Sequence, residues 1–474
     1  MGAQVDSKSQ GKADMEVEMT TMGEGSSSST TLPPGHSSTT SIADVGSHEG
    51  VINVQELPPV DRGIRAWTFC AAGFVLEMMV WGFGFSYGIF QDYYTSHPPF
   101  NSSSGITISS VGTIALAFQY GEVFFLSFLL ARYPEYLRPG MWFGLVLYFV
   151  SLFCSSFATK VWQLILLQGV GVGIGGGILY MPVIKLVPEW FSERRGLAGG
   201  IIFSGTGVGG FAFPFLLNYL LAKVGLRWTL RIWAIGTSVC SGIALLGMRS
   251  RFPTPKYSAA QRRPKFLPPR LPFLRNSLFV SFALTNILQG LSYFPVSLYI
   301  LAFTRTLSNQ LTATVVLALF NSSAVLGQVI LGHLSDRVAY PSIMVVSALG
   351  SALGAFLLWG FANAAAYLYV FAIIFGGLSG GFSSTWYNAA AECAGNKPEY
   401  AGMVFSGLAF SKGISAVVGP IISGLLLEAG QGASMGHGFG RFGYGAVEIF
   451  VGSCALASGV GSVAVALARR RVIS

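Results

Sequence analysis

Residues 162–186 read WQLILLQGVGVGIGGGILYMPVIKL, and no charged side chain interrupts them before Lys185. A helix of this length rises far enough to cross the ~30 Å hydrocarbon layer of a bilayer. The whole chain has the same character, since 52% of its residues are hydrophobic and 10% are charged. A water-soluble protein of this size needs more polar surface to cover its core. The sequence therefore predicts a membrane protein.

Apolar stretches of similar length recur along the chain and predict an all-α integral membrane protein with twelve transmembrane helices. We expect these helices at residues 66–90, 108–131, 139–158, 162–186, 195–221, 229–248, 276–303, 312–335, 340–361, 366–391, 400–427 and 443–468. Most of the connections are short, and the longest joins the sixth helix to the seventh.

The connecting pattern divides the predicted helices into two halves of six, residues 58–248 and 276–470. The linker between them, residues 249–275, is rich in Lys and Arg, has no acidic residue, and contains prolines that oppose a long helix. Glycine-rich stretches lead to Tyr180 in the fourth predicted helix and to Tyr387 in the tenth. This repetition predicts pseudo-symmetric halves whose helices pack closely and move relative to one another.

The distribution of charge predicts the orientation of the chain. Residues 1–57 are rich in Ser, Thr, Gly and acidic residues, so we expect a disordered tail and no signal peptide. Lys and Arg are concentrated in the loops on the side of that tail, which predicts that both termini are cytoplasmic. Asn101-Ser102-Ser103 then lies in the first external loop, with Asn101 as a glycosylation acceptor.

Several function classes are not expected. The five cysteines have no CxxC spacing, and the five histidines lie in the tail, in loops or at helix ends. We therefore predict no metal site, no cofactor and no enzymatic active site. The net charge of +9 comes from short loops, where it indicates membrane orientation rather than binding of nucleic acid.

Three short motifs flank the predicted helices. Residues 61–67 (DRGIRAW) open the first, residues 190–200 (WFSERRGLAGG) open the fifth, and residues 332–337 (GHLSDR) follow the eighth. Together they resemble the signatures of the major facilitator superfamily, and more narrowly those of its monocarboxylate-porter branch in its fungal form. The resemblance covers roughly residues 60–470 and implies that superfamily's fold, with a solute bound between the halves near mid-membrane.

Charged residues within these motifs predict contacts between helices at the cytoplasmic face. Asp336 and Arg337 lie at a helix end, where they can pair with a neighbouring helix terminus. Arg194 and Arg195 can pair with the glutamates at 189 and 193. We expect these contacts to act as a conformational latch for the outward-facing state. The alternative interpretation is that the charges only set the topology.

Three charged residues stand out within the predicted helices, because a charge costs roughly 3 kcal/mol or more at the centre of the bilayer. Lys412 is a candidate for binding a carboxylate or phosphate-like group of a substrate, or for pairing with a carboxylate of the protein. Glu77 and Glu122 are candidates for proton coupling, since a buried carboxyl group can hold a proton at physiological pH. Glu122 has a second interpretation as a hydrogen-bonding residue in helix packing.

Neutral polar side chains in the predicted helices complete the predicted substrate site. Asn286, Gln289 and Tyr293 follow i, i+3, i+7 spacing and share one helical face. The other candidates of this kind are Asn321, Gln328, Tyr180, Tyr387 and Asn388. Each has the alternative interpretation of an ordinary hydrogen bond between helices.

The resemblance also bears on the substrate. Monocarboxylate carriers that transport lactate have a lysine near the end of the first helix and an Asp/Arg pair in the eighth. An ungapped comparison puts Phe85, Ala324 and Gln328 at those positions. The resemblance therefore argues against lactate or pyruvate and favours a larger, more aromatic or less charged solute.

We thus predict a monomeric secondary transporter in the plasma membrane that moves a small carboxylate-like or aromatic solute by alternating access. Proton symport through Glu77 or Glu122 and facilitated diffusion are both open hypotheses. The alternatives are a riboflavin-type uptake carrier, an exporter of secondary metabolites, and a membrane sensor that no longer transports. The lipid bilayer and the solute are the only partners that we expect.

Overall fold

The computed structural model describes residues 58–473, apart from residues 254–262, 264, 267–270, 396–399 and 431–438. The predicted tail at residues 1–57 and much of the predicted basic linker lie outside the described residues. All regular secondary structure in the described part is helical. The prediction of an all-α membrane protein is confirmed.

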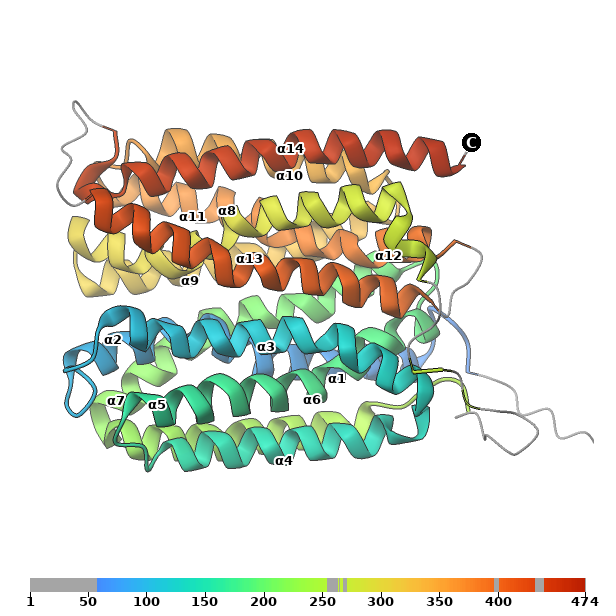
Figure 1. Cartoon of the computed structure of the whole chain (residues 1–474), viewed down its shortest axis with the longest axis horizontal. Helices are drawn as coiled ribbons and strands as arrows, with labels where there is room; N and C mark the ends of the chain where they lie inside the picture. The colour runs from blue at the N-terminus through green and yellow to red at the C-terminus, as the bar shows by residue number, and fades with distance from the viewer. Residues whose placement is uncertain are drawn as a thin grey trace, which may run out of the picture. The chain divides into compact units, whose positions relative to one another are not determined.

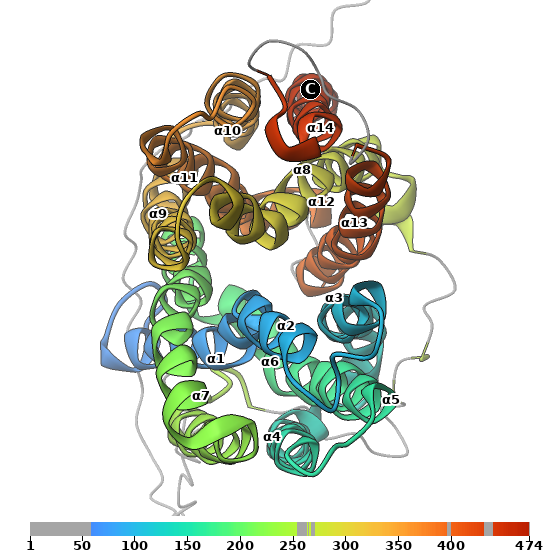
Figure 2. The ribbon, with the colours of Figure 1, turned by 90° about the vertical axis from the view of Figure 1, so that its left-hand side faces the viewer.

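Two sets of helices are visible when the structure is viewed along the helix axes (Figure 2). The first set consists of α1 (Ile64–Phe85), α2 (Tyr87–Ser96), α3 (Gly105–Arg132), α4 (Leu137–Ser155), α5 (Val161–Leu164), α6 (Val172–Trp190) and α7 (Arg195–Gly247). The second set consists of α8 (Ser277–Leu307), α9 (Gln310–Ser335), α10 (Tyr340–Leu353), α11 (Ala365–Gly381), α12 (Trp386–Ala394), α13 (Ala401–Gly430) and α14 (Gly445–Ile473). We call these sets the first and second halves.

Eleven helical segments in the described part of the chain are long and apolar enough to cross a membrane. The longest, α7, has 53 residues. A straight helix of that length would measure roughly 80 Å, far more than the ~30 Å hydrocarbon layer. Gly225, with φ 72° and ψ 174°, breaks α7 into two segments. Glycine adopts positive φ without steric cost, so a sharp reversal replaces the loop expected at residues 222–228. With α7 counted as two segments, the described part of the chain has twelve segments that could cross a membrane.

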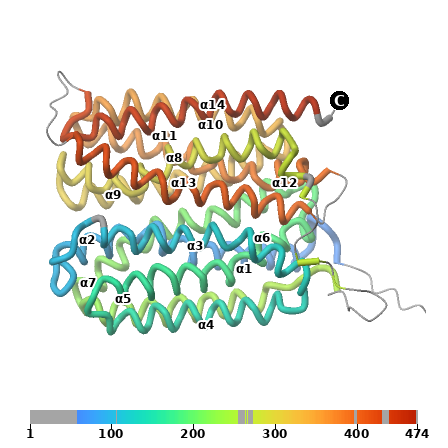
Figure 3. The backbone as a smooth tube through the Cα atoms, viewed as in Figure 1, coloured from blue at the N-terminus to red at the C-terminus, as the bar shows by residue number. Residues whose placement is uncertain are grey.

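Most of the helices run between the same two ends of the structure (Figures 1 and 3). The α2–α3 connection lies at one of these ends, which we call the α2 end. The C-terminus and the segment leaving α7 lie at the other, which we call the linker end. The most extensive contacts between the halves are those of α7 with α9 and of α3 with α13.

Large apolar side chains cover the outer surface as well as the interior. Ile243, Leu326 and Val460 are 66%, 64% and 70% exposed. Apolar exposure on this scale is unfavourable in water but not in lipid. The backbone polar groups in these segments are paired within each helix, as hydrocarbon requires.

Glycines bring α7 close to helices of both halves. A Cβ atom added to Gly209 would lie 2.9 Å from the Cα atom of Gly82 in α1. On the opposite side of α7, a Cβ atom on Gly207 would lie 2.6 Å from the carbonyl oxygen of Asn321 in α9. Helix backbones therefore touch on both faces of α7, which places α1 and α9 on either side of it.

We expect Gly209→Ala to destabilise the protein by about 1–3 kcal/mol, because the added methyl group has no space between α1 and α7. The measurement is the midpoint of thermal unfolding in detergent. Gly236→Ala is the matched control in the same helix, since a Cβ atom there meets nothing within 4 Å. The packing account fails if both variants unfold at the same temperature.

Candidate substrate-binding site

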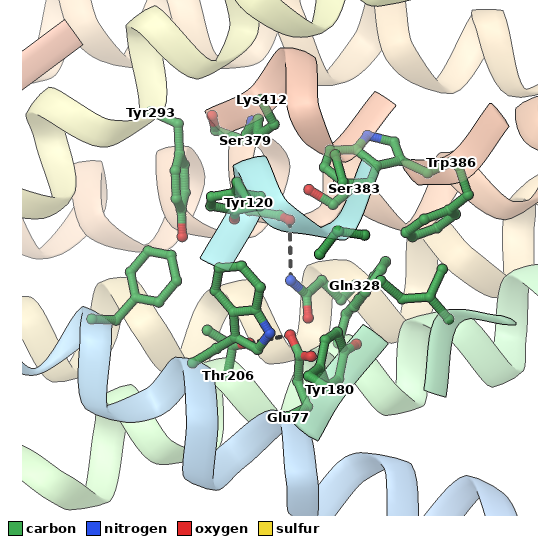
Figure 4. Close-up of a pocket in the computed structure, with 18 residues that line it drawn as sticks. Glu77, Tyr120, Tyr180, Thr206, Tyr293, Gln328, Ser379, Ser383, Trp386 and Lys412 are labelled. Carbon is green, nitrogen blue, oxygen red and sulfur yellow. Dashed lines mark hydrogen bonds between the residues drawn. The ribbon is translucent and has the colours of Figure 1, made fainter. Parts of the chain in front are cut away.

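A cavity of about 630 Å³, counting its open part, lies between the two halves (Figure 4). The first half contributes Glu77, Trp81, Phe85, Tyr120, Val123, Tyr180, Ile184, Phe203 and Thr206 to its lining. The second half contributes Tyr293, Gln328, Ser379, Gly380, Ser383, Trp386, Phe405, Ala409 and Lys412. Eight of these eighteen residues are aromatic, and the lining has one carboxyl group and one amino group.

The carboxyl group of Glu77 projects from the middle of α1 and is 4% exposed. The Thr206 hydroxyl group on α7 donates a hydrogen bond to Oε1 of Glu77. Oε2 has no hydrogen-bond partner within the described protein. Tyr180 from α6 lies beside the carboxyl group (Figure 4). The first half therefore presents a buried acid with one oxygen atom left to bind a donor.

The amino group of Lys412 projects from α13 and is 3% exposed. It donates a hydrogen bond to Oε1 of Gln289. Its Nζ atom also lies 5.4 Å from the ring centroid of Tyr293 and 5.6 Å from that of Phe294. A lysine can donate three hydrogen bonds, and cation–π contacts offset only part of the cost of burying its charge.

At the linker end, Asp336 joins the second half to the first. Its carboxylate accepts hydrogen bonds from the backbone N–H groups of Gly196 at 2.8 Å and Leu197 at 2.9 Å. These groups belong to the first turn of α7, where a negative charge is favoured by the helix dipole. Asn388 donates to the carboxylate at 3.1 Å and to the Ser335 carbonyl oxygen at 3.0 Å.

The arginines expected to pair at this end make different contacts. Arg195 donates through Nε to the carbonyl oxygen of Phe191 at 2.9 Å. Arg194 contacts Asp61 through its backbone N–H at 3.0 Å, and Arg337 is exposed. Glu189 accepts instead from Ser250 and from the backbone N–H of residue 251. The expected pairing of arginines with glutamates is therefore replaced by carboxylates that bind backbone N–H groups.

At the α2 end, aromatic rings separate the cavity from the space beyond. Phe85 of α1 stacks on Phe294 of α8, with centroids 6.5 Å apart, and also contacts Tyr293. Phe85 and Phe294 form part of the lining of a second cavity, of about 610 Å³, that lies between the halves beyond them. Further out, Asp92 of α2 forms an ion pair with Arg305 of α8. The exposed Asn101 lies in the turn after α2.

The structure brings five of the predicted site residues to the cavity. They are Glu77, Tyr180, Tyr293, Gln328 and Lys412. Gln328 donates to the carbonyl oxygen of Gly380 at 3.3 Å, while its own oxygen has no partner within the described protein.

The other predicted site residues do not line the cavity. Asn286 donates to the Leu408 carbonyl oxygen at 2.8 Å, and Asn321 donates to that of Gly210 at 2.9 Å. Gln289 lies behind Lys412, where it also donates to Ser379. These amides satisfy backbone or side-chain groups of neighbouring helices, which is the alternative interpretation given to each of them.

Three more candidates also lie away from the cavity lining. Tyr387 packs its ring on Phe203 and Phe405, with centroids 5.4 and 4.6 Å away. Asn388 belongs to the contact with Asp336 at the linker end. Glu122 of α3 lies against Gly177 of α6, where a Cβ atom would collide with its carboxyl group. Tyr387 and Asn388 are therefore placed in helix packing and in the linker-end contact rather than in the cavity lining. The proposed proton-coupling role of Glu122 stays a prediction, and its position against α6 fits the second interpretation, helix packing.

Sequence reasoning missed several residues that line the cavity. The polar or aromatic ones are Trp81, Phe85, Tyr120, Phe203, Thr206, Ser379, Ser383, Trp386 and Phe405. A signal existed for some of them, because residues at i, i+3, i+4 or i+7 from a charge share its helical face. Trp81 is four residues after Glu77, and Phe405 is seven before Lys412. Phe85 and Tyr120 share helices with Glu77 and Glu122 but fall outside this spacing. The others lie on segments where no candidate charge marked the face.

The model of the Major Facilitator Superfamily matches residues 69–420 and 285–472. The chain belongs to this superfamily. It is therefore a secondary transporter rather than an enzyme.

Curated relatives of this superfamily member are fungal proteins. It is 28% identical over 386 residues to an MFS-type transporter of Gibberella zeae, covering 80% of this chain and 83% of the relative. It is 26% identical to the aspyridones efflux protein of Emericella nidulans, covering 82% and 78%. It is 27% identical to the agnestins efflux protein of Paecilomyces divaricatus, covering 88% and 90%. The superfamily resemblance is confirmed, whereas the narrower monocarboxylate-porter branch is not what these relatives indicate.

Solved structures agree on the fold. The human organic anion transporter TETRAN aligns with a TM-score of 0.61 at 15% identity, covering 84% of this chain and 99% of that one. A bacterial homologue of the human lysosomal transporter Spinster aligns with a TM-score of 0.55 at 16% identity, covering 87% and 98%.

We expect Lys412→Met to raise the thermal stability of the transporter. The substitution keeps the apolar stem and removes a buried charge whose effective desolvation cost is several kcal/mol. Leaving Oε1 of Gln289 without its donor costs about 1–3 kcal/mol, which is the smaller effect. Thermal unfolding in detergent measures the balance, with the exposed Lys223→Met as the control. A lower stability than wild type would show that the charge holds the fold together.

Proposed function

We propose that this chain exports a small organic secondary metabolite through the central cavity by alternating access. The observation that carries the proposal is a cavity rich in aromatic side chains that is lined by both halves and bounded by contacts between them at each end. Because the two halves share the lining, rocking one half against the other changes the end from which a solute can reach the site. The efflux names of two relatives support the outward direction.

The proposed orientation places the linker end in the cytoplasm and the α2 end outside the plasma membrane. The excess of Lys and Arg near the linker end supports it. In this orientation the solute enters after the contact of Asp336 with α7 opens. It leaves after Phe85 and Phe294 separate and the ion pair of Asp92 with Arg305 breaks.

Glu77 is the proposed site of proton coupling. Its side chain lines the cavity, and one of its carboxyl oxygen atoms is buried with no hydrogen-bond partner within the described protein. A solute that donates a hydrogen bond to this oxygen competes with a proton for it. Export would then be coupled to the return of a proton, which makes the transporter an antiporter.

A second candidate function is uptake of a carboxylate by proton symport. Lys412 favours it, because a buried amino group facing a cavity can bind an anion. In that case a proton on Glu77 would accompany the anion inward.

Transport by inside-out plasma-membrane vesicles from yeast lacking its own carriers tests the proposal. The labelled probes are aromatic acids, monocarboxylates and riboflavin. We expect saturable uptake of an aromatic acid, which corresponds to export from the cell, stimulated by an acidic lumen. Glu77→Gln should reduce the stimulation at least roughly tenfold, whereas the exposed Glu428→Gln should not.

Other results of this experiment would contradict the export proposal. Carboxylate movement only out of the vesicles, together with protons, would favour symport into the cell. An uptake rate that is the same with and without the pH gradient would indicate facilitated diffusion. Absence of transport for every probe would favour a sensor that kept the fold.

We expect Asp336→Asn to open the linker end more often. Hydrogen bonds to a charged acceptor contribute about 1.5–3 kcal/mol each, so their weakening shifts the ratio of states by roughly tenfold or more. The measurement is labelling of Ser383→Cys in the cavity by an impermeant thiol reagent added to inside-out vesicles. Asp92→Asn is the control, since an exposed pair contributes only about 0–1 kcal/mol and lies at the other end. Equal labelling in both variants would argue against a latch at Asp336.

A further inference from the structure

The two charged residues of the cavity lie on opposite walls and are not paired with each other. Glu77 comes from the first half and Lys412 from the second (Figure 4). The ion pairs of the described residues join Arg263 to Glu135, Arg305 to Asp92 and Arg469 to Glu392. Neither charge of the cavity belongs to any of them. Buried charges that are left unpaired are costly, which indicates that a ligand completes them.

The surroundings of Lys412 are suited to an anionic group. Its one hydrogen-bond acceptor in the described protein is the neutral amide of Gln289. Its other contacts are the faces of Tyr293, Phe294 and Phe382, at 5.4, 5.6 and 5.9 Å from their ring centroids. None of these groups neutralises the ammonium charge. The remaining N–H donors can bind the oxygen atoms of an acid.

The surroundings of Glu77 are suited to a hydrogen-bond donor. Thr206 occupies Oε1, and Oε2 has no partner within the described protein. Glu77 lines the cavity, and its unpaired Oε2 is buried, so a hydroxyl or amino group of a solute reaches this oxygen when the side chain turns toward the cavity. Since the acceptor is a buried carboxylate, this bond is charge-assisted.

The lining between the two charges is suited to a flat apolar body. Trp81 lies 4.4 Å from Tyr120 and 5.9 Å from Tyr180, measured between ring centroids. On the opposite wall, Trp386 lies 5.6 Å from Phe405. Aromatic side chains prefer to stack on or meet the edges of other rings, so a conjugated ring system fits this lining better than a flexible aliphatic chain.

We propose that the transported solute is an aromatic acid with two polar ends. Its anionic group binds Lys412, its ring system lies between the aromatic walls, and a hydroxyl or amino group on its far side donates to Glu77. This inference rests on the proposed transport function and adds the chemical class of the solute. It also explains why each half contributes one charged residue to the cavity lining. A solute with two polar ends would contact both halves when it binds.

The test is equilibrium dialysis of the purified full chain in detergent against three matched probes. These are 4-hydroxycinnamate, cinnamate, which lacks the hydroxyl donor, and methyl 4-hydroxycinnamate, which lacks the anion. We expect wild type to bind 4-hydroxycinnamate at least roughly tenfold more tightly than either of the others.

Variants of Lys412 and Glu77 show which residue binds the anionic group of the probe and which binds its hydroxyl group. In Lys412→Met the acid and its methyl ester should bind equally, while the effect of the hydroxyl group remains. In Glu77→Leu the hydroxylated and unhydroxylated acids should bind equally, while the effect of the anion remains. Lys223→Met and Glu428→Gln, at exposed positions, should behave as wild type. Each comparison is a ratio of the affinities of two probes for one variant. A misfolded fraction lowers the binding of both probes equally, so it does not change that ratio.

Several outcomes would overturn the proposal. Equal binding of acid and ester by wild type would show that no anion site exists. An acid preference that persists in Lys412→Met would place the anion elsewhere, and failure of all three probes to bind would exclude this class of solute. These results are separate from the export proposal. Binding as expected without vesicle uptake would refute export alone, whereas uptake of another solute without this binding pattern would refute the class alone.

Discussion

Hydrocarbon offers no hydrogen bonds, and most features of this transporter follow from that constraint. The backbone must pair within each segment, so the described chain is helical throughout. Apolar side chains cover the outer surface as they do the core, because lipid and protein interior are equally apolar. A charge within these helices therefore has no favourable position at the lipid boundary. The cavity between the halves is where Glu77 and Lys412 are found.

The closures of this cavity differ in chemistry at its two ends. At the linker end, a carboxylate binds the first turn of α7, and the backbones of α7 and α9 touch at glycines. At the α2 end, rings of Phe85 and Phe294 meet, with an exposed ion pair beyond them. Hydrogen bonds to a carboxylate are directional and break over a short distance, whereas stacked rings can slide. The linker end is therefore the more sharply defined of the two closures.

The packing of α7 connects fold and transport. Its glycines let α1 approach on one side and α9 on the other, so one helix contacts both halves through its backbone. Small contact surfaces of this kind hold the helices closely without interlocking side chains. Two helices that touch without interlocking side chains can rotate relative to each other. The same glycines thus serve close packing in one state and movement between states.

The amino-acid sequence by itself determined the membrane class, the twelve crossings and the two buried charges of the cavity, because these depend on local hydropathy. Only the tertiary structure decided which polar residues face the cavity. Asn286, Asn321 and Asn388 are polar residues within predicted helices, as Tyr293 and Gln328 are. In the structure, however, the three asparagines form hydrogen bonds to neighbouring helices. The direction in which a side chain points depends on how its helix is rotated against its neighbours, and that rotation is set by packing between residues far apart in the chain. The lining residue Thr206 was missed for the same reason, because its surroundings are assembled by the fold. The reversal at Gly225 is different, since it lies in the gap predicted between the fifth and sixth helices and depends on the backbone freedom of glycine.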